Sequence, residues 1–312
     1  MINHALQASM KNTFPQWPTI NTLIVLLLKK PFAFSVLVFF VLVLLLVVTF
    51  PIAAEPKKAL LNRNNIPLID PIIKQSKNHN PDSFIQGWIK DSETFYESSG
   101  IYGRSFVQRY NDKNSDENSD KSHNQKNITI NLPSRYFAEG LTLFNNMIYL
   151  LTWKEETLFI LDKNTLKTIS TLAYSGEGWG LTHNGSQLIM SNGSADLFFR
   201  DASNFSMTRR ITVPLPLQLN ELEYVNGVIW ANDWNKDDIY AIDSTNGCLL
   251  ARIDLSSLRK RTVTPNSSDI LNGIAYDSTT DGLWVTGKYW PTRYLIEYPN
   301  NRIEQLKASP HC

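Results

Sequence analysis

The feature that most limits the fold of this chain is a repeat of short, strand-like segments. From Pro81 onward, runs such as MIYLLTW (147–153) alternate with pairs of residues that favour tight turns. The turn-forming pairs are Asn145-Asn146, Asn184-Gly185, Asn226-Gly227, Asn246-Gly247 and Asp281-Gly282. Runs rich in β-branched and aromatic residues favour strands, and such pairs tolerate the positive φ angles of hairpins. Hardly any segment keeps a helical period, so we expect an all-β body.

A two-residue pattern gives the period of the repeat. A small or acidic residue followed by an apolar one recurs at Gly87-Trp88, Gly140-Leu141, Gly180-Leu181, Glu221-Leu222 and Gly273-Ile274. The intervals are 53, 40, 41 and 52 residues, and the first of them contains a low-complexity insertion. Antiparallel units of about 40–45 residues are typical of propeller blades. We therefore predict a five-bladed β-propeller over residues 81–312.

The residue before each pair marks the point where an inner strand begins. These five positions hold Gln86, Glu139, Trp179, Asn220 and Asn272. Trp153 and Trp234 stand fourteen residues after Glu139 and Asn220, and Lys288 stands sixteen after Asn272. If the blades are symmetric, all eight side chains meet at one mouth of the channel. Tryptophan walls with one carboxylate, one ammonium group and three carboxamides are typical of a small-ligand site.

Several segments of the body resemble a known family. The segments are FIQGW (84–88), FYESSGIYGRS (95–105), FAEGL (137–141), LTWKEETLFILD (151–162), GEGWGL (176–181), LNELEYVNGVIWANDW (219–234), LNGIAYD (271–277) and LWVTGKYWP (283–291). They resemble the plant- and bacterial-type glutaminyl-peptide cyclotransferases, which are five-bladed propellers. The resemblance implies a transferase that converts amino-terminal glutamine of peptides or proteins to pyroglutamate and releases ammonia.

The resemblance also implies roles for the mouth residues. Glu139 of F-x-E-G corresponds to the acid/base carboxylate, Lys288 to the lysine before an aromatic pair, and Gln86 and Asn220 to amide-contacting residues. The pocket tryptophans correspond to Trp153, Trp179 and Trp234, and we place Asn272 with the substrate-binding group by its register. Ile85 and Trp88 depart from the family's usual Thr and Leu around F-x-Q-G.

Physical chemistry supports the role of Glu139. It would accept a proton from the attacking α-amine and later deliver it to the departing ammonia. Burial would raise the pKa of Glu139, whereas a nearby Lys288 would oppose that rise. Lys288, with Asn220 or Gln86, would stabilise the oxyanion of the tetrahedral intermediate, an effect of about 3–4 kcal/mol per donor.

Other interpretations of these residues remain open. Without the resemblance, Glu139 would more often be a structural carboxylate, and tryptophans more often pack between blades. Trp230 and Trp284 lie within strand interiors and are assigned to the core. Glu223 is interpreted as paired or solvated, and the role of Glu221 is left undecided.

Two other functions compete with cyclisation. The first is a non-catalytic propeller that binds a peptide or protein at the same mouth. The second is a propeller hydrolase of lactones or esters, but such sites usually rest on a channel-bound cation, and one carboxylate disfavours a cation. The five histidines lack ligand spacing, so no metal and no cofactor is expected.

The amino-terminal part has a different character from the body. Residues 31–54 form an uncharged segment that is long enough for one transmembrane signal-anchor helix. A cleaved signal peptide is the alternative. Lys11, Lys29 and Lys30 precede this range, so residues 1–30 should be cytoplasmic and the body should lie on the non-cytoplasmic side. Residues 55–80 are interpreted as a polar stalk, and 111–127 as a low-complexity surface insertion.

Composition excludes some partners. The net charge is +1, so no broad basic surface suggests nucleic acid. Only two cysteines occur, Cys248 and Cys312, which excludes a disulfide scaffold and leaves one bridge as an open possibility. We expect a monomer that acts on peptides or proteins with amino-terminal glutamine and is attached to a membrane through one helix.

Overall fold

A computed structural model describes residues 62–111, 127–234, 236–262 and 269–308 of the chain. All the described residues belong to one compact unit of the chain. The predicted membrane helix at 31–54 lies outside the described residues. Within the described ranges, no helix has the length and apolar character that crossing a bilayer requires.

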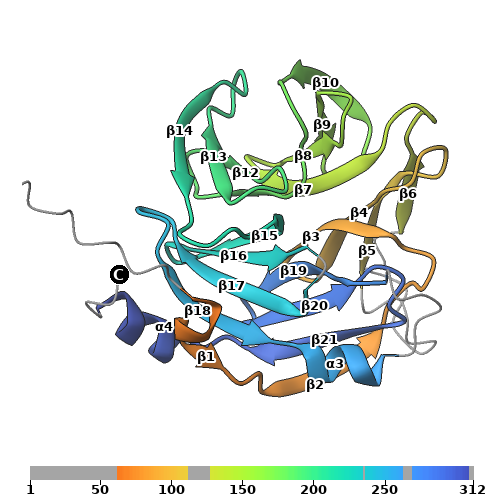
Figure 1. Cartoon of the computed structure of the whole chain (residues 1–312). Helices are drawn as coiled ribbons and strands as arrows, with labels where there is room; N and C mark the ends of the chain where they lie inside the picture. The colour runs from red at the N-terminus through yellow and green to blue at the C-terminus, as the bar shows by residue number, and fades with distance from the viewer. Residues whose placement is uncertain (1–61, 112–126, 235, 263–268, 309–312) are drawn as a thin grey trace, which may run out of the picture. The chain divides into compact units, whose positions relative to one another are not determined.

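Five β-sheets form the body (Figure 1). The first three blades are built from consecutive antiparallel strands. Blade one consists of β3 (Ile85–Asp91), β4 (Thr94–Ser99), β5 (Phe106–Asn111) and β6 (Ile128–Asn131). Blade two consists of β7 (Ala138–Phe144), β8 (Met147–Thr152), β9 (Thr157–Asp162) and β10 (Thr168–Ala173), and blade three of β11 (Leu181–His183), β12 (Leu188–Met190), β13 (Asp196–Arg200) and β14 (Met207–Thr212). Each first strand is the innermost one of its blade.

The last two blades each take a strand from the start of the body. Blade four consists of β15 (Leu219–Val225), β16 (Val228–Asp233), β17 (Asp238–Asp243) and β18 (Leu249–Asp254), with β1 (Leu68–Ile69) parallel to β18 at its edge. Blade five consists of β19 (Leu271–Asp277), β20 (Gly282–Gly287) and β21 (Thr292–Glu297), with β2 (Ile73–Asn78) antiparallel to β21.

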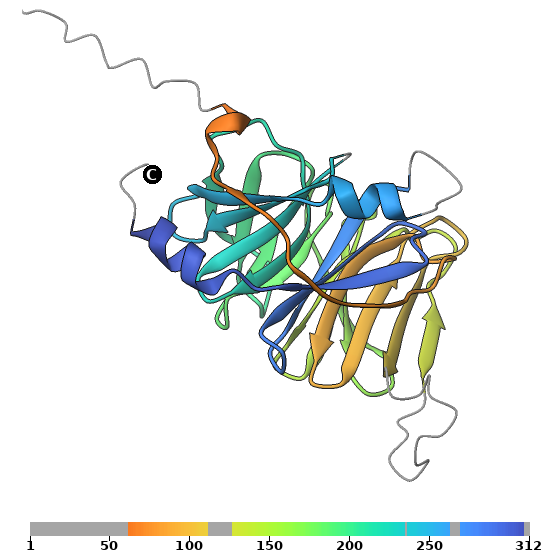
Figure 2. The same ribbon diagram turned by 90° about the horizontal axis from the view of Figure 1, so that it is seen from below.

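The five inner strands contact one another in a closed ring. β3 contacts both β7 and β19, β7 contacts β11, β11 contacts β15, and β15 contacts β19. This cycle confirms the five-bladed propeller. Figures 1 and 2 both show β2, in orange, beside β21, in blue, so the two ends of the body meet in one blade.

The range 55–80 therefore differs from the stalk predicted for it. Its described part contributes the short helix η1 (Arg63–Asn65) and the strands β1 and β2. β2 has the sequence IKQSKN and is almost entirely exposed, because it is the outermost strand of its blade. An outer strand has little apolar alternation, so its sequence resembles that of a polar linker and led to the prediction of a stalk.

The predicted turns have the expected backbone geometry. Each of the five pairs includes at least one residue with positive φ: Asn145 (50°), Asn146 (62°), Gly185 (88°), Asn226 (49°), Gly227 (85°), Gly247 (80°) and Asp281 (48°). These left-handed residues let adjacent strands fold back on each other directly, as hairpins require.

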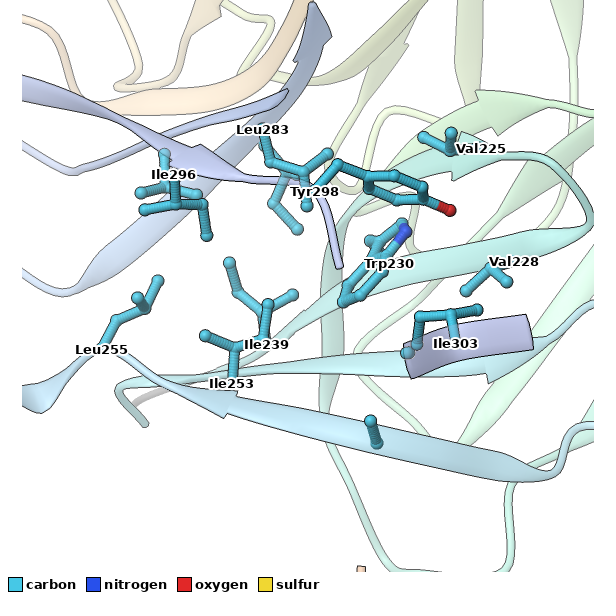
Figure 3. Close-up of a cluster of buried hydrophobic side chains, with 14 of the residues drawn as sticks. Val225, Val228, Trp230, Ile239, Ile253, Leu255, Leu283, Ile296, Tyr298 and Ile303 are labelled. Carbon is cyan, nitrogen blue, oxygen red and sulfur yellow. The ribbon is translucent and has the colours of Figure 1, made fainter. Parts of the chain in front are cut away.

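Each interface between neighbouring blades has its own apolar core. Between blades four and five, the fully buried Trp230 packs against Tyr298, with ring centroids 5.7 Å apart (Figure 3). Ile303, on α4 (Asn300–Lys307), belongs to the same cluster. Trp284 lies in the core between blades five and one. Both tryptophans therefore belong to the core, as predicted.

The remaining features are a helix, the predicted insertion and the two cysteines. The helix α3 (Ser256–Arg261) follows β18. The predicted insertion, apart from its end residues Asn111 and Asn127, lies outside the described residues. Cys248 is disulfide-bonded, and Cys312, the other cysteine of the chain, lies outside the described residues.

Candidate active site

The polar side chains of the mouth stand at β-bulges. In β3, Ile85 pairs with Ser99 and Gly87 with Ser98, so Gln86 is an extra residue in the strand. The register shifts in the same way around Glu139 in β7, Asn220 in β15 and Asn272 in β19. Because a bulge changes the direction of a side chain, these residues can point along the axis instead of into the blade cores.

Glycines bring the inner strands of the first blades into direct contact. A Cβ atom at Gly87 would lie 2.3 Å from the amide nitrogen of Leu141, and one at Gly140 would lie 2.5 Å from that of Leu181. No side chain fits at these distances. Absent Cβ atoms thus allow Gln86 and Glu139, 53 residues apart, to share a hydrogen bond of 3.1 Å from Gln86 Nε2 to Glu139 Oε1.

A cavity of about 200 Å³ lies where these strands begin. It is lined by Phe84, Gln86, Phe137, Glu139, Trp153, Trp179, Asn220, Trp234 and Lys288. Seven of the eight side chains predicted for the mouth are therefore brought together. The eighth, Asn272, is fully buried and does not line the cavity.

Asn272 lies behind the lining and contacts Gln86. Its Nδ2 donates to the carbonyl oxygen of Ile85 at 2.9 Å and to Gln86 Oε1 at 3.4 Å. These contacts orient the Gln86 carboxamide so that its Nε2 faces Glu139. The position predicted to touch substrate thus supports a lining residue, because its bulge directs it toward the neighbouring strand.

The carboxyl group of Glu139 is buried and only half satisfied. Oε1 accepts from Gln86, whereas Oε2 has no hydrogen-bond partner among the described residues. Burial raises the pKa of Glu139 well above its usual value; the charge of Lys288 opposes this rise, and Glu177 and Glu155 add to it. The predicted competition between burial and Lys288 is therefore decided in favour of burial.

Lys288 follows β20 and its backbone amide donates to the carbonyl oxygen of Ile270 at 2.9 Å. Its ammonium nitrogen lies 4.4 Å from the centroid of the Phe84 ring, which provides a cation–π contact. Burial lowers the pKa of Lys288 to about 8, against the opposing effect of the Glu139 charge. The cavity thus holds a carboxyl group, Glu139, whose pKa is raised and an amine, Lys288, whose pKa is lowered, so the two pKa values approach each other.

Aromatic rings form the remaining walls. Trp179 and Trp234 meet edge to face with centroids 6.1 Å apart, and Phe137 lies 5.5 Å from Trp153. Trp234 is 40% exposed and marks the rim of the cavity. Phe84 and Phe137 were not singled out by the sequence, although each precedes its mouth residue by two positions and so shares its side of the strand.

Two further observations concern other parts of the surface. In the described ranges, no group of three or more histidine, cysteine, aspartate or glutamate side chains is arranged to hold a metal ion. A larger groove of about 880 Å³ lies beside α4, between β2, β21 and Arg302. Its lining lacks the convergent, buried polar groups of the smaller cavity.

The fold and the cavity define a class of protein: a five-bladed β-propeller with a small aromatic pocket at one mouth that holds a buried carboxyl group and a lysine. The sequence matches the family described as glutamine cyclotransferase over residues 42–298. It is also 34% identical over 227 residues to the glutaminyl-peptide cyclotransferase of Arabidopsis thaliana, which covers 70% of this chain and 68% of that protein.

A solved structure gives the same result. The crystal structure of the Myxococcus xanthus glutaminyl cyclase matches with a TM-score of 0.65 and 28% sequence identity, over 74% of this chain and 97% of that chain. The chain belongs to the glutamine cyclotransferase family. The resemblance inferred from its motifs is thereby confirmed.

Proposed function

We propose that this chain is a glutaminyl-peptide cyclotransferase, an aminoacyltransferase that converts amino-terminal glutamine to pyroglutamate and releases ammonia. Membership of the glutamine cyclotransferase family supports this activity. The observation that carries the proposal is that Oε2 of the buried Glu139 has no hydrogen-bond partner among the described residues, at a cavity that Lys288 also lines. The cavity, about 200 Å³, suits a single residue, since sites for drug-sized ligands span about 300–1,000 Å³.

The first task of the cavity is to fold the substrate. The attacking amine and the γ-carboxamide belong to the same glutamine, so ring closure requires one particular side-chain conformation. Walls of Trp153, Trp179 and Trp234 restrict the glutamine to a compact shape. Holding the amine near the carbonyl carbon (Cδ) of the γ-carboxamide lowers the barrier through orientation.

Glu139 moves the protons of the reaction. As the amine nitrogen attacks the carbonyl carbon (Cδ) of the γ-carboxamide, the C–N bond of the ring forms and a proton passes from that nitrogen to the Glu139 carboxylate. The protonated Glu139 then donates to the γ-amide nitrogen, whose bond to carbon breaks to release ammonia. A carboxyl group with a raised pKa suits both steps, because acid–base catalysis is most efficient when the pKa lies near the working pH.

The other polar groups stabilise the intermediate and the bound substrate. In its charged form, Lys288 provides a cation for the oxyanion that develops on the γ-carbonyl oxygen. Asn220 Oδ1 is buried without a hydrogen-bond partner among the described residues. It is therefore available to accept an N–H of the substrate amine or carboxamide.

The test is ammonia release from a Gln-Phe dipeptide by the purified full chain. We expect turnover that chelators leave unchanged, because each proton transfer uses Glu139. In Glu139→Gln, which keeps the acceptor for Gln86, kcat should fall by about 10²–10⁴, the usual contribution of acid–base catalysis.

Each result decides a part of the proposal. Turnover that is indifferent to Glu139→Gln would refute the assigned proton carrier. Peptide binding without ammonia release would instead identify a binding module. Loss of activity on chelation, restored by added metal, would contradict the metal-independent scheme.

We infer further that residues 31–54 anchor the chain in a membrane with its body on the non-cytoplasmic side. The absence of charge over this range and the lysines before it support the inference. The full chain should remain in membranes after alkaline extraction, with its body exposed to protease only from the non-cytoplasmic side. Release of the chain into the soluble fraction would contradict the anchor.

A further inference from the structure

Two walls of the cavity donate to one oxygen atom. The indole Nε1 of Trp153 lies 2.8 Å from Glu177 Oε2, and the indole Nε1 of Trp179 lies 3.0 Å from the same oxygen. Trp153 directly follows β8 in blade two, whereas Trp179 precedes β11 in blade three. Glu177 therefore joins two blades at the point where both face the cavity.

The second oxygen of this carboxylate has a different partner. Glu177 Oε1 lies 3.6 Å from the ammonium nitrogen of Lys154, and the Glu177 side chain is 40% exposed. Burial alone would raise the pKa of Glu177, but the two indole donors and Lys154 outweigh it, so the pKa is lowered. The group is thus a carboxylate at neutral pH, and charged acceptors form the stronger hydrogen bonds.

The orientation of the two indoles affects the whole cavity. An indole has a single donor and no acceptor, so a rotated ring would lose its only hydrogen bond. Trp153 packs on Phe137, and Trp179 packs on Trp234. The rings in contact with Glu177 therefore position further rings that touch the substrate space.

The ring of Trp179 has a second restraint on its other side. A Cβ atom at Gly193 would lie 2.5 Å from the Trp179 ring, so the indole fits only against a glycine. This contact limits translation of the ring. The hydrogen bond to Glu177 also restrains its rotation.

We propose that Glu177 is a positioning residue, whose single carboxylate oxygen holds Trp153 and Trp179 in the orientation that encloses the glutamine side chain. This role rests on the proposed function. The charge of Glu177 has a separate effect, since it contributes to the raised pKa of Glu139. Acceptor and charge are thus two properties of one residue that substitution can separate.

Glu177→Gln and Glu177→Leu make this separation. Glutamine keeps one oxygen that can accept from both indoles but carries no charge; leucine keeps neither property. With the Gln-Phe dipeptide, kcat/KM should fall about ten- to a hundredfold in Glu177→Leu, the range for hydrogen bonds to charged groups. Glu177→Gln should stay within about threefold at its best pH, with a pH profile displaced toward lower pH.

The matched control is Glu304→Leu, which removes an exposed carboxylate from α4 that is not part of the cavity lining. It should leave both kcat/KM and the pH profile unchanged. A second check uses the background Trp153→Phe, which keeps a ring and removes one donor. There, Glu177→Leu should cost clearly less than in the original chain, since one of its two contacts is already absent.

A readout independent of turnover keeps the proposal distinct from the proposed function. In the full chain labelled with ¹⁵N-tryptophan, two indole N–H signals should lose the shift of a hydrogen-bonded indole in Glu177→Leu and should move clearly less in Glu177→Gln, whose neutral oxygen can still accept. If no peptide is turned over, this measurement still decides the positioning role. Equal losses in both variants, or indole signals unmoved by leucine, would overturn the proposal.

Discussion

Two buried carboxyl groups of the inner ring, Glu139 on β7 and Glu221 on β15, share much of their environment. Both stand at bulges, and burial raises the pKa of both well above the usual value. Their partners differ. Glu221 Oε1 accepts from the amide of Trp88 at 3.3 Å and Oε2 accepts from that of Ile274 at 2.8 Å. One oxygen of Glu139, by contrast, has no partner in the part of the chain that the structure describes.

The comparison shows that burial and a shifted pKa do not by themselves indicate catalysis. Both oxygens of Glu221 are used to join β15 to the inner strands of blades one and five. Glu221 occupies the position that holds glycine in the other four repeats, and its carboxyl group replaces the direct backbone contact seen at Gly87, Gly140 and Gly180. A cavity-lining oxygen without a partner among the described residues, not proton affinity, distinguishes the proposed proton carrier from the structural group.

The largest expected difference between the two residues is in turnover. Glu139→Gln should lower kcat by about 10²–10⁴. Glu221→Gln should stay within about tenfold, because the Glu221 carboxyl group binds the amides of Trp88 and Ile274, neither of which lines the cavity. The measurement is ammonia release from the same dipeptide, for both variants side by side. A comparable loss of kcat in Glu221→Gln would remove the distinction.

Stability should show the reverse order. Glu221→Leu leaves the amides of Trp88 and Ile274 buried without acceptors, and should lower the free energy of unfolding by about 2–5 kcal/mol. Glu139→Leu deprives only Gln86 of a hydrogen-bond partner and should cost about 1 kcal/mol. Denaturant unfolding followed by tryptophan fluorescence compares them; equal costs would mean that Glu221 joins no blades.

The neighbouring lysine provides a third contrast, since the electrostatic partner of Glu139 is Lys288 and that of Glu221 is Glu223. With the pKa of Lys288 at about 8, kcat should fall about tenfold per pH unit above that value as the ammonium group is lost. In Lys288→Arg the cation persists, so the alkaline limb should disappear even if kcat is lower. A limb unchanged in Lys288→Arg would assign it to another group.

The smallest effect concerns Glu223, two residues beyond Glu221. Its Oε1 accepts from the amide of Tyr276 at 2.8 Å, and burial raises its pKa to about 8. The folded state therefore retains a proton that the unfolded state releases above its ordinary pKa of 4.5. Stability should fall as the pH rises from about 5 to 8, by about 1–3 kcal/mol for this group, and Glu223→Gln should flatten the curve. A slope identical in both proteins would contradict the shifted pKa.

Much of the fold follows from local patterns in the sequence. Turn pairs such as Asn226-Gly227 and the regular position of Gly140 and Gly180 predict hairpins and blades, because their backbone requirements are local. The strands β1 and β2 could not be predicted in this way. Their pairing with β18 and β21 depends on residues about 200 positions away, and an exposed edge strand has no apolar alternation.

The site residues that occupy equivalent positions in the blade repeats could be predicted from the sequence, and those outside the repeat could not. Gln86, Glu139 and Asn220 share one register, and the structure brings them to one cavity. Asn272 shares the register but lies behind Gln86, because side-chain direction at a bulge depends on the neighbouring strand. Glu177 lies in a connection between blades, where no repeat predicts its contacts; two tryptophans of similar register without an evident acceptor were the available signal.

The pairing of β2 with β21 also has a consequence for biosynthesis. Emerging early from the ribosome, β2 must wait until more than two hundred further residues have been translated before its partner exists. Until then the ring of blades is incomplete, and the exposed strand edges at its two ends can pair with other chains. Ribosome-bound intermediates should therefore depend on chaperones until β21 has left the exit tunnel. Pairing of β2 with β21 then completes the last blade and closes the ring.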